Sequence, residues 1–338
     1  MLPVRSRGPS PKRPALFGSA SFDPSDATHP EENHPVLCQG RVAVVTGAAS
    51  GIGAAAARAF AALGMKVAIA DLPSSSDKLQ SLGKELVNVV GEANVLVVPT
   101  DVSVYEEVCK FRETVFEAWS EVGILLNNAG VDGGPDGKRG TSWEGLDAWH
   151  HVFNVNVFGI VNVQQAFIPA MLYQENPAMV INTGSKQGIT NPPGNTAYNA
   201  TKAAIKSLTE GLAHELRTKA DAHGTARITA HLFVPGWTFT GLTGASAGGE
   251  KPAGAWSADE TVKYMLSRVA AGDFYVVCPD NETTPEADQL RIMWAAADVA
   301  QGRPALSRWH RDYKALFEEY MREGHALQVK VAAENKNK

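Results

Sequence analysis

Cysteine is scarce in this sequence, with Cys38, Cys109 and Cys278 as the only three in 338 residues. They are odd in number, lie far apart and form no Cys-x-x-Cys pair, so neither a disulfide framework nor a zinc site is predicted. The histidines add no metal site, because His214 and the glutamate after it lack the second histidine of a His-Glu-x-x-His motif. A reducing compartment is the simplest interpretation, and we expect a cytoplasmic protein without a bound metal.

An excess of positive charge and a long apolar run are also missing. Lysine and arginine number 31 against 36 acidic residues, and the formal net charge is −5. Nothing in the body of the chain therefore favours nucleic acid or an anionic membrane as a partner. The longest uncharged stretch, 152–174, is long enough to span a membrane, but it contains three asparagines, several glutamines and a proline. We expect a buried helix there.

The first 39 residues differ in composition from the rest. They are rich in proline, serine and histidine and show neither helical nor strand periodicity, which predicts a flexible N-terminal arm. No apolar signal core follows the basic start of this arm, so we expect no targeting signal. The chain as a whole is 44% apolar and 20% charged, which is typical of a globular protein with a large core.

From residue 41 onward, short apolar runs alternate with helical stretches. The runs are hydrophobic throughout, which indicates strands buried on both faces of a parallel sheet. We predict an α/β fold with a doubly wound, Rossmann-type sheet as a single domain over 40–280, a lid at about 237–260 and a C-terminal helical extension over 281–338. Strands are predicted at 41–47, 66–71, 95–98, 123–126, 179–183, 227–233 and 273–278, and helices at 52–63, 77–90, 152–173, 196–219, 286–301 and 307–321. A further helix is predicted to open with a capping box of Ser103 and Glu106 and to bear the apolar residues Val108, Phe111, Val115 and Trp119.

A glycine-rich turn, Thr46-Gly-Ala-Ala-Ser-Gly-Ile-Gly53, joins the first strand to the first helix. Glycines there let the backbone approach a pyrophosphate at the helix N-terminus, although glycines at such a turn can also serve packing alone. Asp71 ends the next strand, where a carboxylate can accept hydrogen bonds from ribose hydroxyls. A 2′-phosphate would meet like-charge repulsion at Asp71, and Ser50 offers no positive charge. The sequence thus favours NAD over NADP, while Asp71 as a turn residue before Pro73 is the alternative.

Tyr198 and Lys202 lie four residues apart on a predicted helix, and hence on one face. A free tyrosine has a pKa of about 10, and we expect the neighbouring ammonium to lower it so that the phenol can transfer a proton. The same spacing also arises by chance on surface helices. The pair gains meaning only from its context.

Five features in order resemble the short-chain dehydrogenase/reductase family, over about 200 residues. They are the turn TGAASGIG, the sequence Asn127-Asn-Ala-Gly130, Ser185 placed thirteen residues before Tyr198, the Tyr198-x-x-x-Lys202 pair, and Pro235-Gly236 with Thr240. Asn156, with Gly159 three residues later, matches the family's fourth catalytic residue. The resemblance implies the catalytic residues Asn156, Ser185, Tyr198 and Lys202.

The resemblance also implies how each residue acts. Ser185 would hold the substrate oxygen, Tyr198 would exchange a proton with it, and hydride would pass to or from the nicotinamide. Lys202 would bind the nicotinamide ribose, and Asn156 would anchor a water, although it can also be an ordinary buried amide. The implied cofactor-binding residues are Gly47, Ser50, Gly51, Ile52, Gly53, Asp71, Asp101, Val102, Asn128, Ala129, Gly130, Tyr198, Lys202, Pro235, Gly236, Thr238 and Thr240.

Aromatic and apolar residues suggest the substrate. Trp143, Trp237, Phe239, Trp256 and Met265 fall in segments expected at the mouth of the site, and no charged residue stands out as an anchor for a substrate carboxylate or phosphate. We therefore predict an NAD(H)-dependent oxidoreductase that interconverts a secondary alcohol and a ketone on a hydrophobic small molecule. The alternatives are an NAD(H)-binding sensor without turnover and a lyase or epimerase that uses the same site.

The C-terminal end departs from the family's usual pattern. Where many members end soon after their last strand, this chain continues for about sixty residues beyond 273–280. The added helices are expected to cover an edge that tetrameric relatives use. We therefore predict a homodimer, with a tetramer as the alternative.

Overall fold

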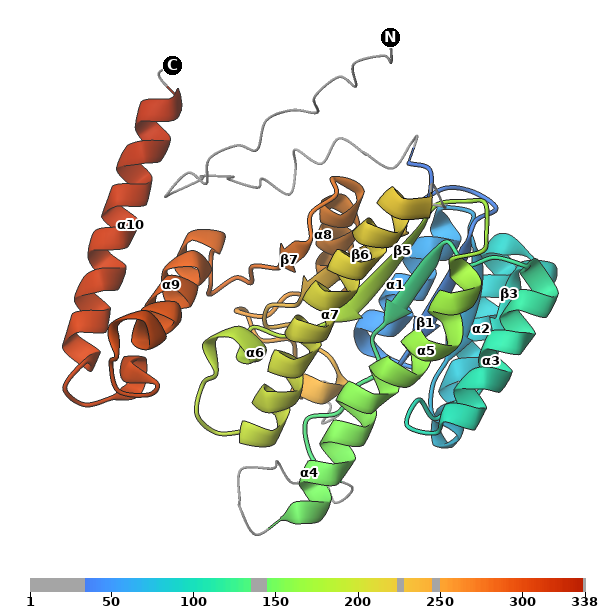
Figure 1. The fold of residues 1–338 in the computed structure, drawn as a ribbon, viewed down its shortest axis with the longest axis horizontal. Coiled ribbons are helices and arrows are strands. Elements are labelled where there is room, and N and C mark those ends of the chain that lie inside the picture. The colour runs from blue at the N-terminus through green and yellow to red at the C-terminus, as the bar shows by residue number, and fades with distance from the viewer. Residues whose placement is uncertain (1–33, 135–144, 224–227, 245–249, 337–338) are drawn as a thin grey trace.

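A seven-stranded parallel sheet with helices on both faces forms the body of the protein (Figure 1). The structure is a computed structural model and describes residues 34–134, 145–223, 228–244 and 250–336. The order across the sheet is β3-β2-β1-β4-β5-β6-β7, with every neighbouring pair parallel, which confirms the predicted doubly wound α/β class. The strands are β1 (Val42–Thr46), β2 (Lys66–Ala70), β3 (Val95–Val97), β4 (Ile124–Asn127), β5 (Ala178–Thr183), β6 (Ile228–Val234) and β7 (Tyr275–Val277).

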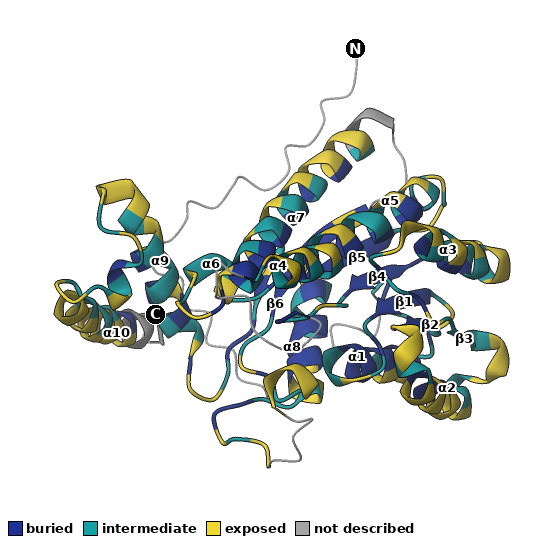
Figure 2. Cartoon of the chain, turned by 90° about the horizontal axis from the view of Figure 1, so that it is seen from below, coloured by how far each residue is buried: buried dark blue, intermediate teal, exposed yellow. Residues whose placement is uncertain are grey.

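Two helical layers bury the sheet, as its continuous apolar strands require (Figure 2). Helices α1, α2 and α8 contribute to the core on one face, and α3, α5 and α7 contribute to the core on the other. The helices are α1 (Gly51–Ala62), α2 (Ser76–Val90), α3 (Tyr105–Trp119), α4 (Leu146–Phe153), α5 (Gly159–Met171), α6 (Gln187–Thr190), α7 (Thr196–His223), α8 (Ala258–Ala270), α9 (Pro285–Gln301) and α10 (Lys314–Lys336).

The helix predicted over 152–173 differs from the observed one. It is divided into α4, a π-helical segment at Asn154–Phe158, and α5. A π-helical turn carries an extra residue, and such turns are frequent at functional sites. Hydrophobic periodicity does not reveal it, because residues on both sides of the segment remain apolar.

The predicted helical extension is present at the C-terminus. Helix α9 packs on α6, and α10 packs on α9 through Trp294, whose ring contacts Phe317 and Tyr320. The second predicted helix, 307–321, is instead a 3₁₀ turn at Ser307–Trp309 followed by the longer α10. In Figure 1, α9 stands beside α6, and α10 lies on the outer side of α9, beyond the β7 edge of the sheet.

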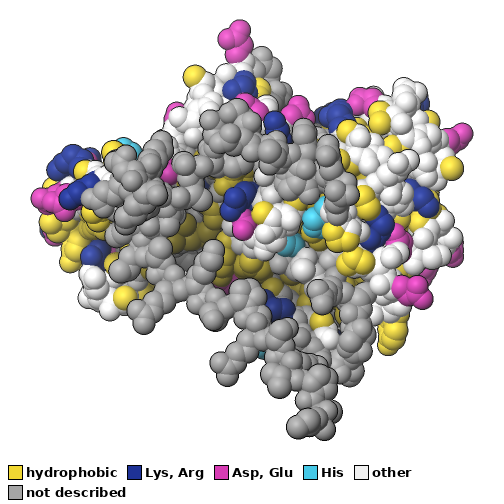
Figure 3. Space-filling model, turned by 90° about the horizontal axis from the view of Figure 1, so that it is seen from above, with side chains coloured by type: hydrophobic (Ala, Val, Ile, Leu, Met, Phe, Trp, Pro, Cys, Tyr) yellow, Lys and Arg dark blue, Asp and Glu magenta, His cyan; other side chains and the backbone are white. Residues whose placement is uncertain are grey.

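Most of the predicted N-terminal arm lies outside the described residues. At its end, Val36 and Leu37 are buried in the core, so the packed domain begins before residue 40. In the segments that the structure describes, no helix is both long and apolar enough to span a bilayer. On the face drawn in Figure 3, basic and acidic side chains are interspersed.

One buried histidine links fold stability to pH. His231 on β6 is 2% exposed, and its ring nitrogens lie 2.7 Å from the Asp273 carbonyl oxygen and 2.8 Å from Thr229 Oγ1. Burial lowers the pKa of His231 below its usual 6.5, although the hydrogen bond and charge of Asp273 act against this. At a pH just below 6.5, the His231 ring is therefore protonated to a smaller extent in the folded protein than in the unfolded chain.

We accordingly predict that the free energy of unfolding falls as the pH drops below about 6.5 and is retained above it. Urea unfolding at several pH values measures this dependence. His231→Gln should reduce the decrease in the free energy of unfolding between about pH 7 and 5. His214→Gln, the same change at an exposed position on α7, should leave this decrease unchanged. Equal losses in the wild type and in the His231 variant would contradict the assignment.

Candidate active site

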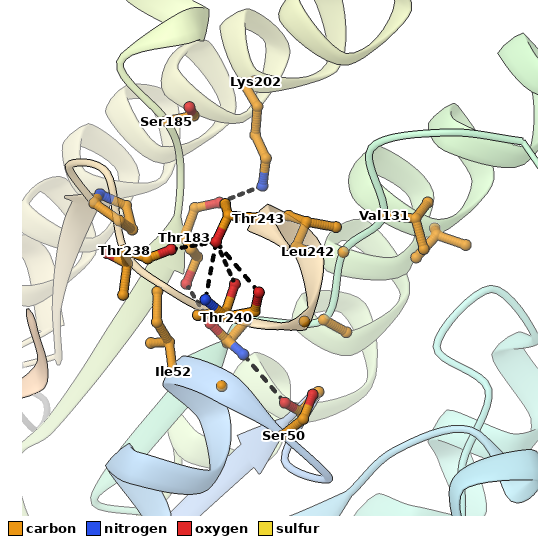
Figure 4. A pocket seen from close by; sticks show the side chains of 18 of the residues that line it. Ser50, Ile52, Val131, Thr183, Ser185, Lys202, Thr238, Thr240, Leu242 and Thr243 are labelled. Atoms are coloured by element: carbon orange, nitrogen blue, oxygen red, sulfur yellow. Dashed lines mark hydrogen bonds between the residues drawn. The ribbon is translucent and has the colours of Figure 1, made fainter. Parts of the chain in front are cut away.

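A cavity of about 690 Å³ lies at the carboxyl ends of the strands. The turns and loops after all seven strands line it, from Gly47 after β1 to Asp280 after β7. In an open parallel sheet this edge is where ligands bind, next to the point at which the strand order reverses, here between β1 and β4. In Figure 4, Lys202 and Ser185 lie at one end of the cavity, and Ser50 and Ile52 lie at the other.

The glycine turn after β1 is packed too closely for side chains. A Cβ on Gly47 would lie 2.7 Å from the Ala129 Cα, and one on Gly53 would lie 2.1 Å from the Gly47 carbonyl oxygen. Gly47 and Gly51 also have positive φ angles of 67° and 54°. The turn brings the first N–H groups of α1 to the cavity, with no acidic residue in that helix's first turn. Gly53 itself does not line the cavity and serves the packing of the turn.

Asp71 both holds this turn and faces the cavity. Its Oδ2 accepts a hydrogen bond of 2.8 Å from the Ala49 N–H, and its Oδ1 accepts one of 2.8 Å from the Leu72 N–H. The alternative role as a turn residue is thus present in the structure. Since each carboxylate oxygen can accept a further hydrogen bond, the same side chain remains able to bind a hydroxyl in the cavity.

The loop after β4 is tied to the glycine turn. Thr46 Oγ1 accepts hydrogen bonds from the N–H groups of Asn128 (3.0 Å) and Ala129 (3.2 Å). The Asn128 amide donates to the Gly47 carbonyl oxygen at 3.2 Å. These contacts fix the backbone from Asn128 to Gly130 along the cavity wall.

Ser185, Tyr198 and Lys202 all line the cavity. Ser185 follows β5, while the other two lie in the first turns of α7. At the start of this helix the Tyr198 N–H donates a hydrogen bond to Asn195 Oδ1. The Lys202 Nζ lies 5.5 Å from the centre of the Tyr198 ring and donates a 2.9 Å hydrogen bond to the Thr183 carbonyl oxygen. The predicted one-face arrangement of the pair is present.

Burial shifts the pKa values of this pair in opposite directions. It raises the pKa of Tyr198 to about 12; a hydrogen bond with Ser185 acts against the rise, and the Asp132 carboxylate adds to it. It lowers the pKa of Lys202 to about 8. The expectation of a lowered tyrosine pKa is therefore wrong for the protein alone, because removal of the phenol from water raises this pKa and Lys202 is not among the groups that shift it. At neutral pH the phenol is protonated and can donate.

Asn156 is placed differently from the other predicted catalytic residues. It is fully buried in the π-helical segment and does not line the cavity. Its side chain accepts from the Val131 N–H at 2.8 Å and donates to the Val131 carbonyl oxygen at 2.8 Å and to Thr201 Oγ1 at 3.1 Å. It lies directly behind Gly130, where a Cβ would be 3.2 Å from its Oδ1. Its side chain thus positions the loop after β4.

Of the residues predicted to contact the substrate, only Trp237 is found among those that line the cavity in the described part of the chain. Trp237 lines the cavity, but Met265 is in the core, and Trp256 packs on the core and donates to Asn281 Oδ1. Phe239 is not among the lining residues, and Trp143 lies outside the described residues. Near the two ends of the predicted lid, residues 237–239 form backbone hydrogen bonds with residue 256. Residues 245–249 of the lid are outside the described part of the chain, and the mobility of the lid stays a prediction.

The cavity brings together most of the residues that the sequence singled out, and it adds others. Besides Gly53 and Asn156, every predicted catalytic and cofactor-binding residue lines it. Sequence reasoning missed Lys186, although it directly follows Ser185, and also His151 and Asp280, which no local pattern connects to the site. Across the described ranges, no group of three or more His, Cys, Asp or Glu side chains is placed to hold a metal ion. The predicted residues that line the cavity are Gly47, Ser50, Gly51, Ile52, Asp71, Asp101, Val102, Asn128, Ala129, Gly130, Ser185, Tyr198, Lys202, Pro235, Gly236, Thr238 and Thr240.

Comparison with known proteins gives a consistent result. A family model described as short chain dehydrogenase matches residues 41–250. The chain is 31% identical over 277 residues to 1-deoxy-11-beta-hydroxypentalenate dehydrogenase of Streptomyces exfoliatus, covering 80% of this chain and 94% of that protein.

Solved structures agree with the sequence relatives. A short chain dehydrogenase/reductase from Burkholderia phymatum in complex with NAD superposes with a TM-score of 0.65 at 30% identity, covering 78% of this chain and 96% of that one. A 3-ketoacyl-(acyl-carrier-protein) reductase from Brucella melitensis complexed with NADH gives a TM-score of 0.55 at 26% identity, covering 74% and 93%.

Proposed function

This chain belongs to the short-chain dehydrogenase/reductase family of oxidoreductases, and on that premise we propose that it interconverts a secondary alcohol and a ketone on a hydrophobic small molecule with NAD(H). The observation that carries the proposal is that Ser185, Tyr198 and Lys202 share one cavity with the glycine turn and Asp71. A hydride-transfer site needs groups that bind the nucleotide cofactor, here the glycine turn and Asp71, and a proton donor near the substrate, here Tyr198.

The cavity fits a dinucleotide. The positive φ angles and close packing of the glycine turn leave backbone N–H groups of α1 facing the cavity, which suits a pyrophosphate. When bound, the nicotinamide would supply or accept the hydride. We assign the phosphates to Gly47, Ser50, Gly51 and Ile52, the adenosine to Asp71, Asp101 and Val102, and the nicotinamide half to Asn128, Ala129, Gly130, Lys202, Pro235, Gly236, Thr238 and Thr240.

The chain's own residues account for the proton step. Ser185 supplies a hydroxyl that can hold and polarise the substrate oxygen, and Tyr198 gives this oxygen a proton during reduction or takes one during oxidation. With a pKa raised to about 12, Tyr198 is in the form that donates. Lys202 is held at Thr183 beside the phenol, and Asn156 fixes the neighbouring loop.

The preference for NAD over NADP is supported by Asp71. Its carboxylate lines the cavity at the end of β2, and Leu72, the residue that follows it, brings no positive charge. A 2′-phosphate placed there would face an uncompensated negative charge. The hydroxyls of an unphosphorylated ribose would instead find a hydrogen-bond acceptor.

We predict that Tyr198→Phe lowers kcat/KM by about 10²–10⁴-fold and leaves NADH affinity nearly unchanged. Steady-state kinetics and fluorescence titration of NADH measure the two effects. Tyr173→Phe, the same change at a side chain that is 92% exposed, serves as the control and should match the wild type. Full activity in the Tyr198 variant would remove this phenol from the mechanism.

We also predict that Asp71→Asn reduces the preference for NAD(H) over NADP(H) by about tenfold, because it removes the charge and keeps the shape. The ratio of kcat/KM values for the two cofactors gives the result. Asp77→Asn, an exposed site on α2 with the same change of charge, should leave the ratio unchanged. A preference that survives in the Asp71 variant would show that another group reads the ribose.

A further inference from the structure

A lysine clamped by two aspartates borders the catalytic end of the cavity. Lys186 follows Ser185 directly and lines the cavity. Its Nζ lies 2.6 Å from Asp288 Oδ2 and 3.3 Å from Asp280 Oδ2. The side chains of Asp280 and Asp288 are only 7% and 8% exposed, and that of Lys186 is 19% exposed. The three form a nearly buried cluster, of which Lys186 and Asp280 line the cavity and Asp288 does not.

Asp280 is firmly placed as an anion. Its Oδ2 also accepts the Trp237 N–H at 3.0 Å, and its Oδ1 accepts the Glu282 N–H at 3.1 Å. Burial alone would raise the pKa of Asp280, but these hydrogen bonds and the Lys186 charge outweigh burial and lower it. The carboxylate is therefore ionised at neutral pH. Through Trp237 it also fixes the start of the segment that carries an indole into the cavity.

Asp288 comes from the C-terminal extension. It lies in the first turn of α9, the helix that packs on α6, which begins right after Lys186. Burial raises the pKa of Asp288, although the Lys186 charge acts in the opposite direction. The extension thus reaches the residue next to Ser185 by an ion pair.

The charge of this cluster decides what it can bind. One ammonium group faces two carboxyl groups, so Lys186 has no surplus positive charge for a ligand. In the described part of the chain, the lysines and arginines that line the cavity are Lys186 and Lys202, and Lys202 donates to the Thr183 carbonyl oxygen. A substrate carboxylate near Ser185 would have to displace a buried aspartate from Lys186, or it would remain next to the cluster without a positively charged partner.

We propose that Asp280 and Asp288 select uncharged substrates, by occupying Lys186 and by repelling a carboxylate next to Ser185. This inference rests on the proposed function and narrows its substrate class to ketones and alcohols without an anionic group. Without the two aspartates, a lysine at this position would anchor a carboxylate. Asp280 and Asp288 are therefore specificity-determining residues for the proposed reaction, and one of them is supplied by the extension.

The test compares probes of the same shape that differ in charge: the 3- and 4-carboxamides of cyclohexanone and the corresponding carboxylates. Calorimetric titration into the NADH complex of Tyr198→Phe gives affinities without turnover. We expect each carboxamide to bind at least about tenfold more tightly than its carboxylate. Adding Asp280→Asn and Asp288→Asn should reduce this ratio by about tenfold or reverse it, whereas Glu286→Gln, on the same turn of α9, should leave it unchanged.

The salt dependence of the two affinities gives a further test. In Tyr198→Phe, which retains both aspartates, a higher salt concentration should reduce the ratio of carboxamide to carboxylate affinity. This measurement requires no substitution of Asp280 or Asp288. A ratio near one, tighter binding of the carboxylates, or no binding of the carboxamides would overturn the inference, as would an unchanged ratio in a folded double variant. Failure of the proposed function appears separately, as carboxamides that bind but are not reduced when Tyr198 is present.

Discussion

The site depends on the close approach of two backbone segments, the glycine turn after β1 and the loop after β4. At Gly47 the two come so near that a single added carbon would collide with the Ala129 backbone. Thr46 and Asn128 lock this approach with hydrogen bonds. Because β1 and β4 are neighbours at the point where strand order reverses, the contact creates one continuous wall. One end of this wall suits a pyrophosphate, and the other leads to Ser185 and Lys202.

Burial then shifts the pKa values of two side chains at the Ser185 end of the cavity. The same removal from water that keeps the Tyr198 phenol protonated brings the pKa of Lys202 down to about 8. The π-helical segment contributes indirectly, since it carries Asn156 behind Gly130 and holds the loop at Val131. In the proposed mechanism, the protein's contribution is thus mainly to orient a proton donor, a hydroxyl and a wall of backbone groups.

Much of this arrangement could be predicted from the sequence. Continuous apolar runs identified the parallel sheet, and the glycine turn, Asp71 and the Tyr198–Lys202 spacing are local patterns that fall where the family places them. Contacts between distant segments could not be predicted. Lys186 meets Asp288 only because α9 folds back onto α6, and Asn156 in the π-helical segment meets Val131 from a distant part of the chain. The cytoplasmic location and the dimer stay predictions.

The central claim, that this cavity carries out hydride transfer with a tyrosine as proton donor, is tested most directly by incubating the full chain with NADH and a panel of uncharged hydrophobic ketones. The loss of reduced-nicotinamide absorbance and the alcohol formed are both measured. The account predicts that at least one ketone is reduced, with one alcohol formed for each NADH consumed. Tight binding of NADH without its consumption across the panel would contradict it and would favour a sensor.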